Sequence, residues 1–175
     1  MKKMQLNQNN KIIVKLLLES KNLKANIFYK KLDLAIKKTV GHKLFTLMVV
    51  DKSRKYVERV YSNNKKIYPL LGKKPIPRNA WTKRVIINKK EFLGSNFNQI
   101  KKLFFDYKII KSLGCGSIIN IPIISNKNVL GTLNILHKEN YYNKKSINDV
   151  KNFAQLLTPY FILHQIKMKK NKSKF

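Results

Sequence analysis

The sequence contains little cysteine and no long apolar run, and each shortage excludes a class of protein. Cys115 is the only cysteine among 175 residues, so an internal disulfide and a multi-cysteine zinc site are both excluded. No apolar run reaches the ~18 residues of a membrane-spanning helix. Residues 1–10 are polar and lack the apolar stretch of a signal peptide. These absences together predict a protein of the reducing cytoplasm without a membrane span.

Acidic residues and arginine are also scarce. Lysine and arginine together number 38 against 8 acidic residues, which gives a formal net charge of +30. Such a charge attracts polyanions: RNA, DNA or an anionic membrane surface. Phosphate-binding sites, however, tend to keep arginine, whose planar guanidinium grips phosphate with two hydrogen bonds. The abundance of lysine, asparagine and isoleucine, which share A/T-rich codons, favours compositional drift. Weak, salt-sensitive, non-specific binding of nucleic acid is expected under either interpretation.

Length and hydrophobic patterning predict one domain of mixed secondary structure. We expect an N-terminal extension over 1–22, the domain over 23–166, and a disordered lysine-rich tail over 167–175. The expected elements are, in chain order, a short helix over 11–19, a helix over 22–40 ending at Gly41, strands over 44–50 and 56–62, a short helix capped by Asn79, a short strand over 91–94, a helix over 97–112, strands over 118–124 and 129–137, and a helix from Ser146 to about Met168 kinked at Pro159.

The last two predicted strands each carry one amide where an apolar residue is expected: Asn120 and Asn134. A buried amide without a partner costs roughly 1–3 kcal/mol, so two of them suggest a pocket that holds something small. If Ser125 pairs with Val129, the amides lie opposite each other on one face. If Ile124 pairs with Val129 instead, they point to opposite faces. A further alternative is that they bond only each other or a nearby backbone.

Four blocks of sequence resemble the GAF domain, a small-molecule-sensing relative of the PAS fold. Their order and spacing, over about residues 25–165, carry the resemblance, which is greatest to short stand-alone bacterial GAF proteins. The blocks are G-H-K-L-F-T-L-M-V-V-D at 41–51, Y-V-E-R-V-Y-S-N from Tyr56, I-I-K-S-L-G-C-G-S-I-I-N-I-P-I-I from Ile109 and V-L-G-T-L-N-I-L-H-K-E-N-Y-Y from Val129.

The resemblance implies an α+β fold of the GAF/PAS type, with a central antiparallel sheet of about six strands and helices on both faces. The first and last helices would cover one face, and a ligand pocket would lie on the other, under residues 63–112. It also implies a homodimer formed through the terminal helices. The chain lacks the cysteines of free methionine-(R)-sulfoxide reductases, the Asn-Lys-Phe-Asp-Glu motif of cyclic-nucleotide binders and the Cys-His pair that attaches bilins. No cofactor is therefore expected.

Strand alternation places Arg59 and Tyr61 on one face of the second predicted strand. A carboxylate or phosphate on the ligand would suit Arg59, whereas an exposed ion pair with Asp51 or Glu58 is the plain alternative. Trp81, the sole tryptophan, either lines the roof of the pocket or packs in the core.

Two further residues invite a chemical role. Asp106 either orients a ligand amine or pairs with Lys102 one helical turn earlier. Cys115 lies between two glycines, which suits a nucleophile beside free backbone amides, with a histidine as its base. Burial as a small apolar residue is the favoured interpretation of Cys115.

The sequence thus predicts a cytoplasmic GAF-type protein that binds a small metabolite. A small-metabolite enzyme using Cys115 is a less favoured alternative, and a polyanion-binding protein acting through the lysine-rich surface is another. The candidate ligand-binding residues are Arg59, Tyr61, Trp81, Cys115, Ser117, Asn120 and Asn134.

Overall fold

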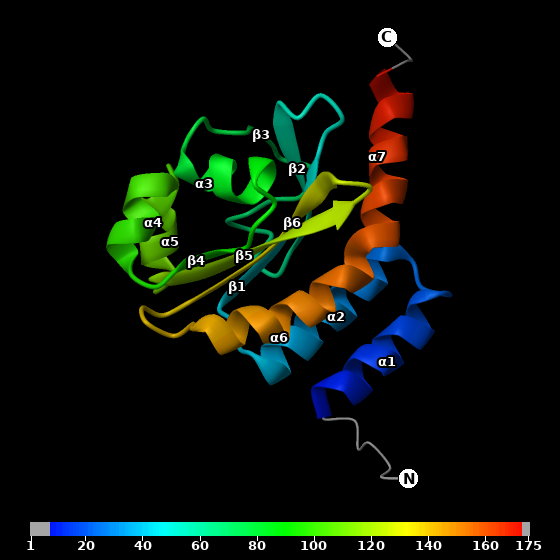
Figure 1. Cartoon of the computed structure of the whole chain (residues 1–175), viewed down its shortest axis with the longest axis horizontal. Helices are drawn as coiled ribbons and strands as arrows, with labels where there is room; N and C mark the ends of the chain where they lie inside the picture. Colours follow the sequence, from blue (N-terminus) through cyan, green and yellow to red (C-terminus); the bar gives the residue numbers. More distant parts are fainter. Residues whose placement is uncertain (1–7, 173–175) are drawn as a thin grey trace.

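A six-stranded antiparallel sheet forms the centre of the molecule (Figure 1). The structure, a computed structural model, describes the backbone of residues 8–172 and the side chains of residues 8–169. The strand order is β3-β2-β1-β6-β5-β4. The strands are β1 Leu44–Val50, β2 Tyr56–Ser62, β3 Lys73–Pro75, β4 Phe92–Gly94, β5 Ser117–Ser125 and β6 Asn128–His137. All five predicted strands are present, and the short β3 was missed because Lys-Lys-Pro carries no apolar alternation.

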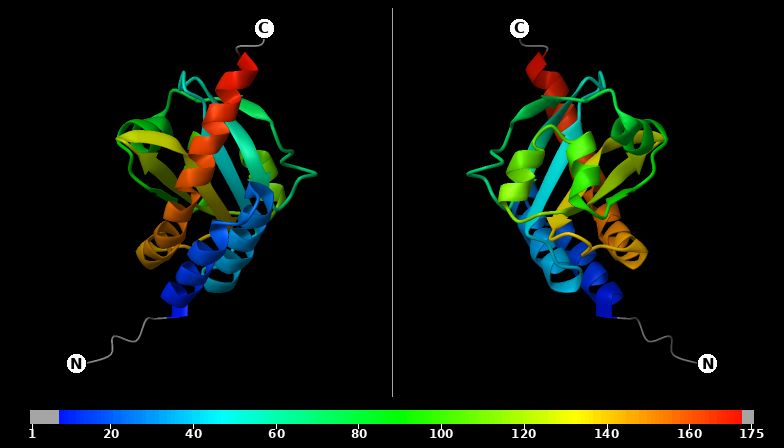
Figure 2. Two further views of the ribbon diagram at one scale, coloured as in Figure 1. Left: turned by 90° about the vertical axis from the view of Figure 1, so that its right-hand side faces the viewer. Right: turned by 90° about the vertical axis from the view of Figure 1, so that its left-hand side faces the viewer.

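The helices near both chain ends cover one face of the sheet, as the resemblance implied (Figures 1 and 2). Phe28, Phe45, Phe153 and Phe161 are fully buried between these helices and the strands, and they form the main core. The helices are α1 Gln8–Ser20, α2 Ala25–Thr39, α6 Lys144–Ala154, the 3-10 helix η2 Gln155–Leu157 and α7 Thr158–Lys172.

The ends of these helices agree with the sequence at some points and correct it at others. Gly41, with a φ of +85°, follows α2 as predicted, and its N–H bonds Ile36 O at 3.0 Å. The kink at Pro159 is confirmed, because η2 separates α6 from α7. The prediction of a disordered tail from residue 167 is wrong for residues 167–172, because α7 continues to Lys172. Residues 1–7 and 173–175 lie outside the described range.

Short helices cover the opposite face of the sheet. They are α3 Ala80–Thr82, the π-helix η1 Lys83–Ile87, α4 Phe97–Leu103 and α5 Tyr107–Ser112. Asn79 caps α3 as predicted, by accepting a hydrogen bond from Thr82 N. The single helix predicted over 97–112 is wrong, because Phe104 adopts an extended backbone and divides it. The division turns Phe104 inward, against Trp81 and Phe92.

A β-bulge in β2 changes which residues share a face. Leu47 pairs with Tyr61, but Met48 pairs with Arg59, so Val60 is an extra residue. The expectation that Arg59 and Tyr61 share one face is therefore wrong. Tyr61 lies on the helix-covered side, where its hydroxyl donates to Asp33 Oδ2 at 2.8 Å.

A second bulge settles the register of β5 and β6. Ile124 does pair with Val129, across a two-residue turn whose residues both have positive φ. The pairing then shifts by one residue between Ile123 and Ile124, and this restores the register that sets Asn120 opposite Asn134. Because alternation continues from the bulge, both amides point to the face away from the terminal helices. Without the bulge, the Ile124–Val129 pair would have placed them on opposite faces of the sheet.

Within residues 8–172, no helix is both long and apolar enough to cross a membrane. The predicted homodimer and the predicted domain boundaries stay predictions, because the structure holds a single chain.

Candidate ligand-binding cavity

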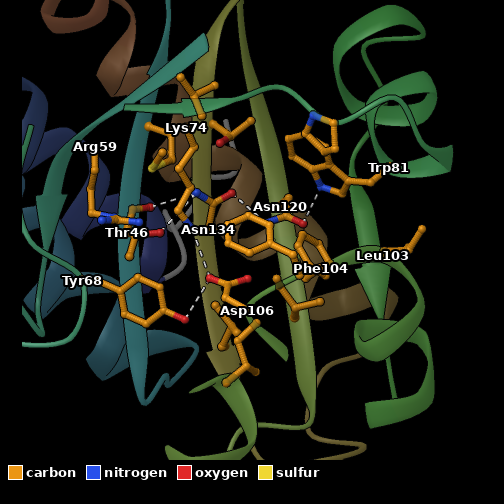
Figure 3. A pocket seen from close by; sticks show the side chains of 18 of the residues that line it. Thr46, Arg59, Tyr68, Lys74, Trp81, Leu103, Phe104, Asp106, Asn120 and Asn134 are labelled. Atoms are coloured by element: carbon orange, nitrogen blue, oxygen red, sulfur yellow. Dashed lines mark hydrogen bonds and ion pairs between the residues drawn. The ribbon is translucent and has the colours of Figure 1, made fainter. Parts of the chain in front are cut away.

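A cavity of about 130 Å³ lies between the sheet and the short helices that cover its second face (Figure 3). Strands β1, β2, β5 and β6 contribute Thr46, Arg59, Asn120 and Asn134 to its wall, and most of the remaining wall is apolar. An engineered protein cavity of roughly 150 Å³ holds a benzene molecule. The space therefore suits a compact ligand of similar size.

The two amides belong to a chain of hydrogen bonds that crosses the cavity wall (Figure 3). Trp81 Nε1 donates to Asn120 Oδ1 at 2.9 Å, and Asn120 Nδ2 donates to Asn134 Oδ1 at 2.6 Å. Asn134 Nδ2 donates in turn to Thr46, at 3.3 Å to Oγ1 and 3.4 Å to the backbone oxygen. The amides thus bond each other, as one sequence-based alternative held, and they also tie the roof of the cavity to the sheet.

Arg59 enters the cavity as a buried cation. It is 4% exposed, its Nη1 donates to Pro69 O at 2.9 Å, and its guanidinium carbon lies 4.9 Å from the centre of the Tyr68 ring. Its Nε has no hydrogen-bond partner among the described residues. Burial lowers the pKa of Arg59, against the opposing effect of Tyr68 and Asp106, yet arginine stays charged at neutral pH.

The alternative of an exposed ion pair for Arg59 is wrong. Asp51 accepts hydrogen bonds from the turn that follows it, including those of Lys55 N and Tyr56 N at 3.0 Å. Glu58 faces the terminal helices, where its Oε1 lies 2.8 Å from His164 Nε2.

Asp106 is the only carboxylate in the described cavity wall, and it is already engaged. Its Oδ2 accepts from Tyr68 OH and from Lys74 Nζ, both at 3.1 Å. The expected pairing with Lys102 is therefore wrong, because the break in the predicted helix turns Asp106 inward. Burial and the neighbouring carboxylate raise the pKa of Tyr68, which keeps its hydroxyl a hydrogen-bond donor. With Arg59, the wall holds two cations and one carboxylate, so one positive charge is unbalanced.

Three of the candidate residues lie outside this cavity wall: Tyr61, Cys115 and Ser117. Ser117 Oγ donates to Lys138 O at 2.7 Å. Cys115 is 3% exposed in an apolar cluster, and burial raises the pKa of its thiol to about 11. Its Sγ contacts Leu113 O at 3.8 Å.

The histidines that were considered as a base for Cys115 are engaged elsewhere. His42 Nε2 lies 2.9 Å from Asp33 Oδ1, His164 lies against Glu58, and His137 Nδ1 accepts from Lys138 N. Among the described residues, the structure therefore gives Cys115 neither a base nor access to the cavity.

Sequence reasoning placed Arg59, Trp81, Asn120 and Asn134 in the cavity but missed four of its polar residues, Thr46, Tyr68, Lys74 and Thr132. Tyr68 and Lys74 belong to the turn-rich stretch around β3, where no apolar period reveals an orientation. The available signal was indirect: a single tyrosine beside prolines in a segment expected to cover the pocket.

Solved GAF domains are similar to this chain over most of its length. The GAF domain of a phosphoenolpyruvate-protein phosphotransferase from Acinetobacter has a TM-score of 0.69 at 8% identity, over 90% of this chain and 94% of that one. Its counterpart from Coxiella burnetii has a TM-score of 0.68 at 14% identity, over 95% and 97% of the two chains. A free methionine-R-sulfoxide reductase from Neisseria meningitidis, in complex with its substrate, has a TM-score of 0.60 at 10% identity, over 87% of both chains. No protein-family model and no curated protein matches the sequence.

Proposed function

We propose that this chain, whose fold is that of a GAF domain, is a sensory or regulatory protein that binds a small molecule in the cavity. The observation that carries the proposal is Arg59, a buried guanidinium that lines an open space and has no carboxylate within ion-pair distance among the described residues. Leaving a charge buried and unpaired is costly, which is why such groups are found at sites that receive a ligand. A mostly apolar wall with a few convergent polar groups is typical of small-molecule sites.

Similar folds support the sensory side of the proposal. A two-component sensor histidine kinase from Bacillus halodurans contains a GAF domain that matches this chain with a TM-score of 0.67 at 13% identity. Cys115 is poorly suited to catalysis, because its thiol is buried and the pKa of that thiol lies well above neutral pH.

A thermal-shift screen against a metabolite library at fixed moderate salt tests the proposal. A ligand at about 100 times its dissociation constant adds roughly 2.7 kcal/mol of stability. For a chain of this length we expect a rise in Tm of roughly 5–10 °C. The control is Thr132→Phe, which projects a ring from β6 into the cavity. A ligand that stabilises this variant as much as the parent protein binds elsewhere and contradicts the proposal.

A groove on the outer surface favours a second function, binding of single-stranded nucleic acid. It lies on α4 and α5 and is lined by Phe97 and Tyr107 together with Lys101, Lys108 and Lys111. Lys111 Nζ lies 5.1 Å from the centre of the Phe97 ring, so cations and aromatic faces are interleaved. Stacking of bases on aromatics beside a basic surface is the usual means of binding single strands.

Fluorescence anisotropy with a labelled oligonucleotide across a salt series tests the second function. We expect the triple variant Lys101, Lys108 and Lys111→Gln to bind more weakly and with a smaller salt slope. A matched removal of three lysines from α1 and α2, Lys15, Lys30 and Lys37→Gln, is the control. Equal losses in both triple variants would mean that net charge alone is responsible.

A further inference from the structure

The charged groups of the cavity narrow the class of ligand. Arg59, Lys74 and Asp106 are the formally charged side chains in its described wall. Asp106 already accepts from Lys74 and Tyr68, so it is not free to receive a ligand cation without losing one of them. Arg59 has no carboxylate within ion-pair distance among the described residues: its Nε is unbonded and its Nη1 is bound only to a neutral backbone oxygen. A ligand anion at Arg59 would balance the cavity.

The position of Arg59 suits such a contact. Figure 3 shows its guanidinium reaching from β2 to the side of the cavity between Thr46 and Tyr68. Its contact with the Tyr68 ring, 4.9 Å from the ring centre, helps to fix its orientation. A guanidinium held in this way can offer a planar oxyanion the N–H groups that its bond to Pro69 O leaves free.

Charge and volume favour a carboxylate over a phosphate. A phosphate monoester carries between one and two negative charges at neutral pH, whereas one positive charge is unbalanced in the wall. The second charge of a phosphate would lie in the same small cavity as the Asp106 carboxylate, and like charges at close range repel. A volume of about 130 Å³ leaves room for a carboxylate and a small body.

The remaining wall residues indicate the chemistry of the rest of the ligand. The amide chain from Trp81 to Thr46 satisfies its members within the protein, so it does not call for a strongly polar ligand. Ile110, Ile118 and Leu136 offer apolar contacts near the break between α4 and α5. A branched aliphatic chain or one aromatic ring fits such a surface.

We infer that the cavity binds a small monocarboxylate with an apolar body, whose carboxylate pairs with Arg59 in the cavity. This inference rests on the proposed function and adds to it the class of ligand.

Calorimetry with matched acids and amides tests the inference at pH 7. The probes are 3-methylbutyrate, benzoate, phenylacetate and 3-phenylpropionate, each paired with its primary amide, together with phenyl phosphate. Acid and amide differ mainly in charge, so their ratio of affinities measures what Arg59 contributes. For the best pair we expect the acid to bind at least roughly tenfold more tightly than the amide.

Two variants assign the effect to Arg59. Arg59→Met keeps an unbranched side chain but removes the charge, and we expect it to abolish the preference for the acid while the amide binds as before. Arg78→Met removes the same charge from an exposed position and should leave the preference intact. If Arg59→Met fails to fold, Arg59→Lys, which retains the cation but loses the fork, should reduce the preference.

The outcomes separate the inference from the proposed function. Amides that bind as tightly as their acids, or an acid preference that survives Arg59→Met, would overturn the inference and leave the cavity a small-molecule site. Tighter binding of phenyl phosphate than of any carboxylate would also overturn it. Failure of every probe, acid and amide alike, would overturn the inference, whereas the proposed function would fall only if the thermal-shift screen also found no ligand that depends on the cavity.

Discussion

The two faces of the sheet differ in how their buried charged side chains are paired. On the face under the terminal helices, Asp33 meets His42 and the Tyr61 hydroxyl, and Glu58 meets His164. On the cavity face, Arg59 is buried to a similar degree but has no carboxylate partner. The first face pairs its buried carboxylates with histidines and fills the remaining space with aromatic rings, although Asp33 Oδ1 and His42 Nδ1 make no hydrogen bond among the described residues. The second face keeps a space and an unbalanced cation, and for that reason we propose it as the binding face.

Removal of a core ring should distinguish the faces by the largest margin. Phe153 of α6 is fully buried, so Phe153→Ala leaves a large void and should cost about 3–5 kcal/mol of unfolding free energy. Phe104→Ala removes a half-buried ring beside the cavity and should cost less, about 1–2 kcal/mol. Urea denaturation measures both values. Equal losses would contradict the view that packing is concentrated on the helix-covered face.

Charge removal should give opposite results on the two faces. Asp33→Ala leaves the Tyr61 hydroxyl and His42 without their partner, and it should cost about 3 kcal/mol. Arg59→Met removes a cation that has no ionic partner, so the unfolding free energy should stay within about 1 kcal/mol of the parent protein or rise. Glu19→Gln, which removes a partly exposed ion pair with Lys31, is a control expected to change the unfolding free energy far less than Asp33→Ala does. A large destabilisation by Arg59→Met would mean that the arginine serves the fold.

The amide chain tests whether the roof of the cavity depends on the sheet. Asn120→Val leaves Trp81 Nε1 and Asn134 Oδ1 without their partners and should cost about 1–3 kcal/mol. The protein should still fold, because the helix-covered core is untouched, but ligand affinity should fall as Trp81 loses its anchor. Calorimetry and denaturation on the same sample separate the two effects. Unchanged affinity would contradict a binding role for this chain of hydrogen bonds.

The order of most elements and the two hairpins, β1–β2 and β5–β6, could be predicted from the sequence, because alternation and helical spacing are local signals. The orientation of individual residues could not, where a bulge intervenes. The extra residue Val60 places Arg59 and Tyr61 on opposite faces of the sheet. Asn120 lies opposite Asn134 only because a second bulge shifts the register that the turn sets. The first bulge carries no glycine, whereas Gly131 lies at the second, where it pairs with Ile123. The partners of Asp106 were missed for a related reason: Lys74 and Tyr68 come from a distant irregular segment, and only the folded chain brings them together.

The thiol of Cys115 should produce the smallest effect, since it belongs to neither network. Burial raises its pKa to about 11 from the ordinary thiol value of 9.0, so the folded state releases this proton at higher pH than the unfolded state does. The stability that this group contributes is complete below about pH 9 and is lost as the pH rises through about 11. Alkylation by iodoacetamide at pH 7.5 should therefore be slow in the folded protein and fast in urea. The parent protein should also lose slightly more stability than Cys115→Ala between pH 8 and pH 10. Rapid alkylation of the folded protein would instead identify an accessible, activated thiol and would favour an enzyme that uses Cys115.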